Sequence, residues 1–358
     1  MGTTKINQIR LMKEIADKIL ETIKDYRNDD GIILDSDHII NWGKQFGEDA
    51  EFVLNEISEI IPQVYISKEK AKEYIDSHIR KLLKDFRYSN ITQLLIDTEF
   101  LDMQLPYKSQ PAILNILEIL LNEKYGESYL KYKTYPKINF VYLDDILASG
   151  STIGNHMVKW LKEVNSDGIS NVENVLNDNY RLSINLFCIH NWGHSFQKFR
   201  LRKEFDDKID KKIFWHYDYL IENHAKWNNQ SLNVAFPTDD QPTNVKSYLA
   251  NLEAPKYEDY AYRKPSQPAV ESFFTSAKNR VKYENIILQK GLTIIEMIQS
   301  EIKPNIRPLG LINPNYKTFG LGTHFFTWRN IPNNSPLVFW WGVAGHEWIP
   351  LFPVANRG

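Results

Sequence analysis

The chain has 358 residues, a size that permits one large domain or two smaller ones. Hydrophobic residues make up 42% of it and aromatic residues 13%, which excludes a disordered chain and predicts a globular protein with a substantial core. The 43 Lys and Arg residues balance 45 Asp and Glu residues, so no overall field draws the protein to nucleic acid or to an anionic membrane surface.

The amino-terminal residues MGTTKINQIR lack the apolar core of a signal peptide, and polar residues interrupt the longest apolar stretches. We therefore expect a cytoplasmic protein with no membrane segment. The single cysteine, Cys188, excludes an internal disulfide. Its place in the apolar run INLFCI predicts a small buried side chain rather than a reactive thiol.

The first part of the chain, residues 1–90, has the pattern of a helical region. Apolar residues recur at intervals of three and four between Lys5 and Phe86, which is the spacing of amphipathic helices. We predict about four helices here, one ending at Pro62 and the next starting at Ser67.

The second part, residues 91–225, alternates between apolar runs and helical patterns. Strands separated by helices indicate a parallel sheet with helical crossovers, and therefore an α/β fold. The predicted strands are 92–97, 138–143 and the run RLSINLFCIH ending at His190, and the predicted helices start at Pro111 and span 151–164.

The third part, residues 226–358, is predicted to pack on this core as a flap, a long helix and a hairpin. Proline and polar residues dominate 235–268, which is typical of a long loop or flap. A helical pattern follows over 268–302, broken only at Gly291. The alternating runs GTHFFTWR and LVFWW, separated by NIPNNSP, predict a carboxyl-terminal β-hairpin.

The segment FVYLDDILASGSTI joins an apolar strand to a helix through two acids and a loop of small residues. Such a loop can aim backbone N–H groups at one point, where the dipole of the following helix adds positive potential. Hydroxyl side chains add donors, and glycine permits close approach. The predicted phosphate-binding residues are Ala148, Ser149, Gly150, Ser151 and Thr152.

The two acids, Asp144 and Asp145, come just before this loop. Their carboxylates can accept hydrogen bonds from vicinal sugar hydroxyls, and their charge suits a nearby Mg²⁺ ion and a cationic ring. A helix cap formed by Ser149 or Ser151 is the structural alternative, but it does not explain paired acids whose repulsion and desolvation cost stability. The segment therefore predicts a site for a 5-phosphorylated ribose.

The run LDDILASGST resembles the phosphoribosyl pyrophosphate (PRPP) motif of type I phosphoribosyltransferases. Ala148 stands where a hydroxyl residue is frequent, which weakens phosphate binding without abolishing backbone donation. The resemblance implies that Asp144 and Asp145 are catalytic, that they face the ribose hydroxyls, and that they contact Mg²⁺ indirectly, through ribose or water. It also implies that residues 148–152 hold the 5-phosphate.

Most of the chain resembles the phosphoribosyltransferase-like effectors of bacterial conflict systems (PRTase-CE), including some retrons. The segments that carry this resemblance are NWGKQF, PYKSQ, the acid-pair loop and WRNIPNNSPLVFWW. It implies a toxin-like anti-phage effector rather than a housekeeping salvage enzyme, with a defence-system partner such as a reverse transcriptase complex.

Phosphoribosyltransferases also hold pyrophosphate with a loop that lies after an earlier strand and before a helix, and PYKSQP stands in that place. Lys108, as a catalytic group, offers a positive charge, Ser109 a hydroxyl and Gln110 an amide, all suited to pyrophosphate oxygens. A solvent-exposed lysine before an ordinary helix cap is the alternative.

His190 and Asn191 are candidates for contact with the base or acceptor. A predicted strand ends in these two residues, which places them at the carboxyl edge of the sheet, where doubly wound folds bind their ligands. A hydrogen-bonded structural histidine is the alternative. His190 and His194 have the spacing of metal ligands on a helix, but the preceding strand and Gly193 argue against a helix there.

Asn333 and Asn334 are the other candidates for base contact, because two adjacent amides can bind a base edge or a phosphate. An asparagine pair after proline is also ordinary turn chemistry.

Two functions therefore stay open. The first is an enzyme that binds PRPP or a 5-phosphorylated nucleotide with Mg²⁺ and cleaves or transfers at ribose C1, as a pentosyltransferase or a nucleotide N-glycosidase. The second is a non-catalytic module that senses PRPP or a nucleotide and acts through a protein partner. The sequence specifies neither the acceptor nor a general base.

Overall fold

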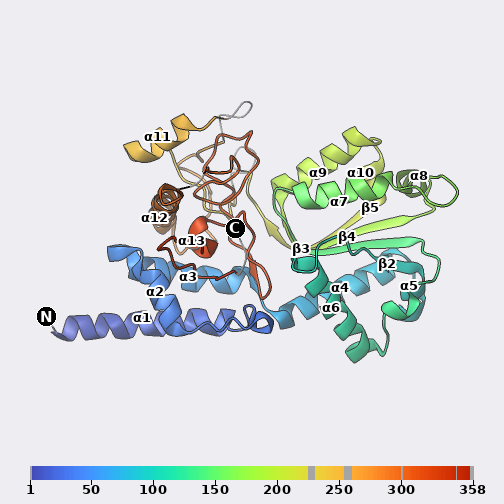
Figure 1. Ribbon diagram of the computed structural model, residues 1–358, viewed down its shortest axis with the longest axis horizontal. Helices are drawn as coiled ribbons and strands as arrows, with labels where there is room; N and C mark the ends of the chain where they lie inside the picture. The colour runs from blue at the N-terminus through green and yellow to red at the C-terminus, as the bar shows by residue number, and fades with distance from the viewer. Residues whose placement is uncertain (1, 225–229, 254–259, 300, 344, 355–358) are drawn as a thin grey trace. The chain divides into compact units, whose positions relative to one another are not determined.

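The computed structural model describes residues 2–224, 230–253, 260–299, 301–343 and 345–354. The chain forms two compact units, coloured along the sequence in Figure 1. One unit, the sheet unit, is continuous and comprises residues 68–221. The other, the split unit, joins residues 1–67 to residues 222–358. Most of the predicted first and third parts of the chain therefore contribute to one unit.

The sheet unit is built on parallel strands, which confirms the predicted α/β fold. Its strands are β2 (Thr98–Phe100), β3 (Asn139–Leu147), β4 (Arg181–His190) and β5 (Ile213–Ile221). They pair in the order β2-β3-β4-β5. The register of the two central strands places Asp144 beside Leu186 and Ile146 beside Cys188. Cys188 is buried there, as the sequence predicts.

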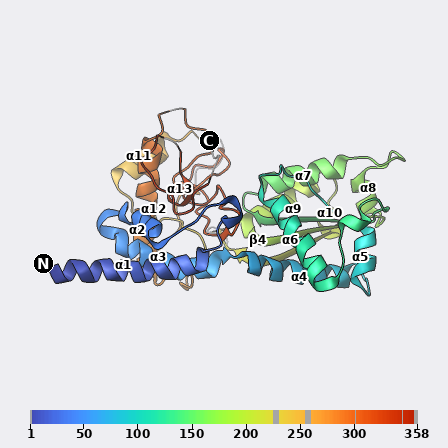
Figure 2. The ribbon, with the colours of Figure 1, turned by 60° about the horizontal axis from the view of Figure 1, so that its bottom comes forward.

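Helices cover both faces of this sheet, as Figures 1 and 2 show. They are α4 (Lys68–Asp85), α5 (Ile91–Asp97), α6 (Ser109–Leu120), α7 (Ser151–Lys162), α8 (Asn171–Leu176), α9 (Asn191–Glu204) and α10 (Ile209–Lys212). Helices α4 and α6 lie on one face, and α7 and α9 lie side by side on the other. Apolar residues of the strands, including Phe140 and Ile184, pack with Met157 and Trp160 of α7 in one core.

The strand predicted at 92–97 is wrong, because these residues form helix α5. The Asn90 side chain caps that helix by accepting a hydrogen bond from Gln93 N at 3.0 Å. The strand begins only at Thr98. A helix of 7 residues is too short to display its period, so its apolar run resembles that of a buried strand.

The split unit contains the first three helices of the amphipathic region predicted near the amino terminus, whereas the next one, α4, belongs to the sheet unit. The α-helices of the split unit are α1 (Gly2–Ile23), α2 (Ser36–Lys44), α3 (Ala50–Val64), α11 (Thr243–Asn251), α12 (Ala277–Glu296) and α13 (Leu337–Trp340). Pro62 does not end a helix as predicted, because α3 continues through it to Val64. In the last turn of α3 the missing N–H removes a single backbone bond, while Ile61 and Val64 stay buried.

The predicted carboxyl-terminal hairpin is wrong. Strand β6 (Phe326–Thr327) pairs in parallel with β1 (Tyr65–Ile66), and residues 337–340 form helix α13. The alternating aromatic residues reflect burial rather than pairing: Phe326 and Phe339 pack against each other with ring centroids 5.3 Å apart.

The long predicted helix starts later than its pattern indicated. Helix α12 begins at Ala277, after Ser276 accepts a hydrogen bond from Asn279 N. Gly291 does not break it. A β-carbon at that position would lie 2.6 Å from the carbonyl oxygen of Pro308, so glycine permits the close approach of a neighbouring segment. The predicted flap at 235–268 contains helix α11.

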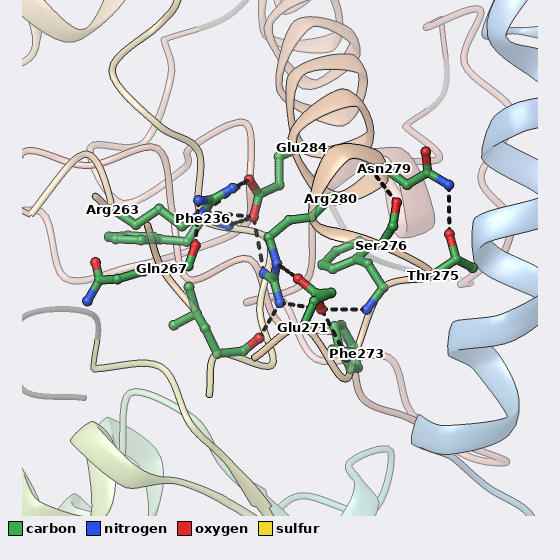
Figure 3. A network of polar contacts seen from close by, with 12 residues as sticks. Phe236, Arg263, Gln267, Glu271, Phe273, Thr275, Ser276, Asn279, Arg280 and Glu284 are labelled. Carbon is green, nitrogen blue, oxygen red and sulfur yellow. Dashed lines mark hydrogen bonds and ion pairs between the residues drawn. The ribbon is translucent and has the colours of Figure 1, made fainter. Parts of the chain in front are cut away.

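A buried network of charges attaches irregular segments to α12 (Figure 3). Arg263 Nη2 lies 2.7 Å from Glu284 Oε2, and both side chains are 1% exposed. Arg280 pairs with Glu271 and Glu284 and donates to the carbonyl oxygens of Leu232 and Val234. Because every charge in this network has an opposite partner, it fixes the course of these segments in the split unit.

Among the helices in the described ranges, none combines the length and the apolar character that crossing a bilayer requires.

Candidate functional site

The acid pair lies near the carboxyl end of β3, a central strand of the sheet unit. Asp144 and Asp145 are both 3% exposed. Three residues after Leu147 the chain reaches Gly150, which precedes α7 and has a φ of 79°. The strand, the loop and the helix therefore occur in the predicted order. We call residues 148–152 the glycine loop.

Four groups surround the carboxylate of Asp144. Oδ1 accepts hydrogen bonds from Ser109 Oγ at 2.9 Å and from Asp145 N at 2.9 Å. Oδ2 accepts from the hydroxyl of Tyr142 at 3.1 Å and from Gln104 Nε2. The carboxylate is therefore fixed by groups from β3, from the start of α6 and from the segment before it.

Ser109 links the two acids. Its Oγ, which lies in the first turn of α6, is 3.2 Å from Asp145 Oδ1 as well as 2.9 Å from Asp144 Oδ1. Asp145 Oδ1 also accepts from Ile146 N at 2.8 Å. A single hydroxyl proton can serve only one carboxylate at a time, so Ser109 couples the charge states of the pair.

Burial and the neighbouring Asp145 raise the pKa of Asp144 to about 8, although its hydrogen bonds act in the opposite direction. Burial also raises the pKa of Tyr142 far above its usual range. The hydroxyl of Tyr142 lies 3.1 Å from His156 Nδ1 on α7, and burial lowers the pKa of that histidine. At neutral pH the free protein therefore does not hold two full charges on the acid pair.

The glycines in and near the loop are closely packed. A β-carbon on Gly150 would lie 2.6 Å from Gln197 Nε2, and one on Gly154 would lie 1.9 Å from Gln197 Oε1. A β-carbon on Gly193, in the first turn of α9, would lie 1.9 Å from the carbonyl oxygen of Ala148. The start of α9 thus packs directly against the glycine loop.

The glycine loop presents hydroxyls at the amino end of α7. Ser151 and Thr152 are exposed, and Ser149 Oγ lies 3.4 Å from Ser151 Oγ. Helix α7 has 12 residues, enough for a helix dipole to favour an anion at this end.

The predicted pyrophosphate segment lies beside the acid pair, but its three side chains have different environments. Lys108 is exposed, with Nζ 5.3 Å from the centre of the Tyr107 ring. Gln110 is fully buried: Oε1 accepts from Met103 N and Gln104 N, and Nε2 donates to Leu143 O. We therefore assign Gln110 a positioning role, because it holds the segment that carries Gln104.

His190 ends β4 and is buried, and burial lowers its pKa to about 3. Asn191 begins α9. The expectation that Gly193 argues against a helix is wrong, because α9 contains it and needs it to approach Ala148. His194 packs against Trp215, with ring centroids 4.7 Å apart. The described residues contain no group of three or more potential metal-ligating side chains.

Asn333 and Asn334 belong to the split unit. The Asn334 amide donates to the Leu311 carbonyl oxygen at 2.6 Å, and the Asn333 carbonyl oxygen accepts from Leu311 N at 2.8 Å. The other candidate residues Ser109, Asp144 and Asp145 lie in the sheet unit, where Ser109 contacts both acids directly.

Sequence reasoning missed several residues that the fold brings to the acid pair and the loop. Tyr142 carries a recoverable signal, since it stands two residues before Asp144 on a strand and therefore shares its face. Gln104, His156 and Gln197 carry no comparable signal, because a tertiary contact alone places each of them.

A parallel sheet whose acid-bearing central strand leads through a glycine loop into a helix is the arrangement of phosphoribosyltransferase-like proteins. The sequence model of one such family, PRTase-CE, matches residues 39–354. The chain therefore belongs to the PRTase-CE family. No curated protein and no solved structure matches it.

Proposed function

We propose that the protein binds PRPP or a 5-phosphorylated nucleotide at the acid pair and the glycine loop, and that it cleaves or transfers at ribose C1. One observation carries the proposal: two buried, adjacent carboxylates precede a glycine loop whose exposed hydroxyls stand at the start of a helix. Backbone N–H groups and the helix dipole suit a phosphate, while carboxylates suit sugar hydroxyls.

In the proposed reaction the 5-phosphate is held by residues 148–152, and Asp144 and Asp145 accept hydrogen bonds from the ribose hydroxyls. With PRPP as substrate, the bond from C1 to the pyrophosphate oxygen breaks, and its electron pair leaves with pyrophosphate. An acceptor atom or water then bonds to C1 and releases its proton to solvent. The negative acid pair favours the positive charge that develops at C1.

The residues of the site fit a magnesium ion that is held mainly by its substrate. Asp144 and Asp145 are the carboxylates nearest the loop, and Asp144 already accepts four hydrogen bonds. Mg²⁺ commonly keeps water and phosphate oxygens as most of its ligands, so contact with this pair through ribose or water suffices. When bound, the ion would neutralise charge on pyrophosphate. Lys108, exposed beside Ser109, adds a positive charge from the protein.

Membership of the PRTase-CE family supports a role as an effector. We propose that the protein acts in the cytoplasm as a toxic effector in bacterial anti-phage defence, including retron systems. A defence-system protein, for example a reverse transcriptase complex, would then control it.

The second candidate function is a sensor that binds PRPP or a nucleotide without turnover. The hydrogen bonding of Asp144 favours it, because a carboxylate held by four protein groups needs to exchange one of them before it can bind a sugar hydroxyl. A binding event that rearranges these groups is a natural signal to a partner.

Purified protein with PRPP and Mg²⁺ distinguishes these functions. Calorimetry measures binding, and release of pyrophosphate measures turnover. We expect both for the enzyme; binding without pyrophosphate or other product supports the sensor, and absence of binding to PRPP and to 5-phosphorylated nucleotides contradicts the site. A metabolite profile of cells after induction identifies the depleted pool.

A further inference from the structure

The Gln197 side chain on α9 is buried, but its amide group makes no hydrogen bond to the described residues. The residue is 1% exposed, and within the described part of the chain neither Nε2 nor Oε1 has a hydrogen-bond partner. Burying both ends of an amide without partners is unfavourable, and most buried polar side chains avoid it. Gln110, which is also fully buried, shows the usual arrangement, with three hydrogen bonds to the backbone.

This amide lies directly against the glycine loop. The space that a side chain on Gly150 would need is filled by Gln197 Nε2 and Cγ, and the space at Gly154 by Gln197 Oε1. The amide therefore lies along the first turn of α7, with its nitrogen beside Gly150. Two glycines in this turn give the amide its access to the loop.

Positive charge lies along the same contact between helices. Arg200, one turn further along α9 than Gln197, donates from Nη2 to Asn155 Oδ1 on α7 at 2.8 Å. Its Nη1 would lie 2.8 Å from a β-carbon on Gly154. An anion at the start of α7 thus meets the helix dipole together with a nearby guanidinium.

We propose that Gln197 is a specificity residue of the glycine loop, whose Nε2 donates a hydrogen bond to the anionic group held by residues 148–152. The inference rests on the proposed function, because it takes that group to be the 5-phosphate. A phosphate oxygen supplies the acceptor that the buried amide lacks. Gln197 thereby favours ligands with a 5-phosphate over the corresponding nucleosides, which have only a hydroxyl there.

Gln197→Met tests this proposal, because methionine keeps the length of the side chain and removes the amide. Without ligand we expect an unchanged or higher melting temperature, since a buried amide without partners is lost. Affinity for PRPP, measured by calorimetry with Mg²⁺, should fall by about tenfold or more, the effect of one hydrogen bond to a charged group. Ribose 5-phosphate should lose the same factor, whereas binding of a nucleoside without phosphate should not change.

Gln110→Met is the matched control. It removes an amide that has three hydrogen bonds, so its melting temperature should fall by several degrees. Gln197→Glu is the second variant: it retains the shape of glutamine and adds a negative charge, and we expect it to weaken PRPP binding more than Gln197→Met does.

The outcomes separate the two proposals. If the wild type binds PRPP and both Gln197 variants bind it equally well, the role of Gln197 is wrong and the proposed function stands. If Gln197→Met instead melts several degrees lower, as Gln110→Met should, and retains its affinity, the amide is structural. If the wild type binds none of these phosphorylated ligands, the proposed function fails and this inference fails with it.

Discussion

The hydroxyl of Tyr142 lies 3.1 Å from Asp144 Oδ2, two residues further along the same strand. It lies equally close to His156 Nδ1, at 3.1 Å, so its single proton can be donated to the acid or to the histidine. Ionised Asp144 receives that proton in a hydrogen bond, and protonated Asp144 donates instead to the tyrosine. The charge of a buried acid is thereby coupled to a partly exposed imidazole.

This relationship leads to a prediction about stability and pH. The folded protein holds the Asp144 proton up to about pH 8, whereas the unfolded chain loses it near pH 3.8. The contribution of Asp144 to stability is therefore fully present below pH 3.8 and is lost as the pH rises towards about 8, by at most about 1.4 kcal/mol per pH unit. Asp144→Asn should lack this loss, so its melting temperature relative to wild type should rise between pH 5 and pH 8. A constant difference over that range would contradict the shifted pKa.

Ser109→Ala should move the pH dependence of activity. Ser109 donates to the acid pair, and its hydrogen bond lowers the pKa of Asp144 against the effect of burial. Without it the pKa rises further, so the acidic limb of the kcat/KM profile should shift to higher pH. Ser149→Ala, which removes a hydroxyl that lies 3.4 Å from Ser151 Oγ, is the control and should leave the limb in place. A shift of the same size in both variants would argue against Ser109 as the bridge.

Gly150→Ala should weaken ligand binding because the added β-carbon displaces Gln197, and a control variant separates this effect from backbone strain. Gly150 and Gly168 have similar φ values of 79° and 76°, but nothing lies within 4 Å of a β-carbon on Gly168. Both alanine variants should lose about 1 kcal/mol of stability from the left-handed backbone. Only Gly150→Ala displaces Gln197 and should lose affinity for PRPP in calorimetry. Equal affinities in the two variants would remove Gly150 from the site.

Replacing both acids, Asp144→Asn with Asp145→Asn, should abolish turnover and leave the fold intact. The pair is proposed to stabilise developing charge at C1, and loss of one such contact commonly lowers the rate by about 10² to 10³. The two effects need not add, because both acids act on one sugar. Pyrophosphate release and thermal melting are measured together. A folded double variant with wild-type turnover would support the sensor instead.

Glu284→Gln should destabilise the protein strongly. Glu284 is fully buried between Arg263 and Arg280, so removing its charge leaves buried arginine charge without compensation, at a cost of about 3–5 kcal/mol. The exposed pair Arg10–Glu14 provides the control, since Glu14→Gln should change denaturant midpoints very little. Similar midpoints for both variants would show that the buried network is not a determinant of stability.

The α/β fold and the arrangement of the loop were predictable because their signals are local. The apolar run before Asp144 and the helical spacing after Thr152 lie within one stretch of sequence, and the structure has β3 and α7 there. Helix α9 was not predicted around Gly193, since glycine is a poor helix former. Glycine is needed at position 193 because the carbonyl oxygen of Ala148, which is distant in sequence, lies too close for any side chain.

The incorrect prediction of a hairpin also results from a contact between residues that are distant in sequence. Alternating aromatic residues at 323–341 have the period of strands, yet the partner of β6 is β1, from the other end of the chain. Hydrogen-bonded pairing between distant segments leaves no periodic trace in either of them. For the same reason, the uncompensated amide of Gln197 was visible only after folding had placed it beside Gly150.

The pairing of β1 with β6 also affects the order in which the two units can fold during translation. The sheet unit is one uninterrupted segment, so its strands can assemble while the ribosome is still adding later residues. The split unit needs residues from both before and after that segment, and its two-strand pairing has to wait until Phe326 and Thr327 have been translated. A nascent chain would thus carry a finished acid pair and glycine loop before its other unit can close.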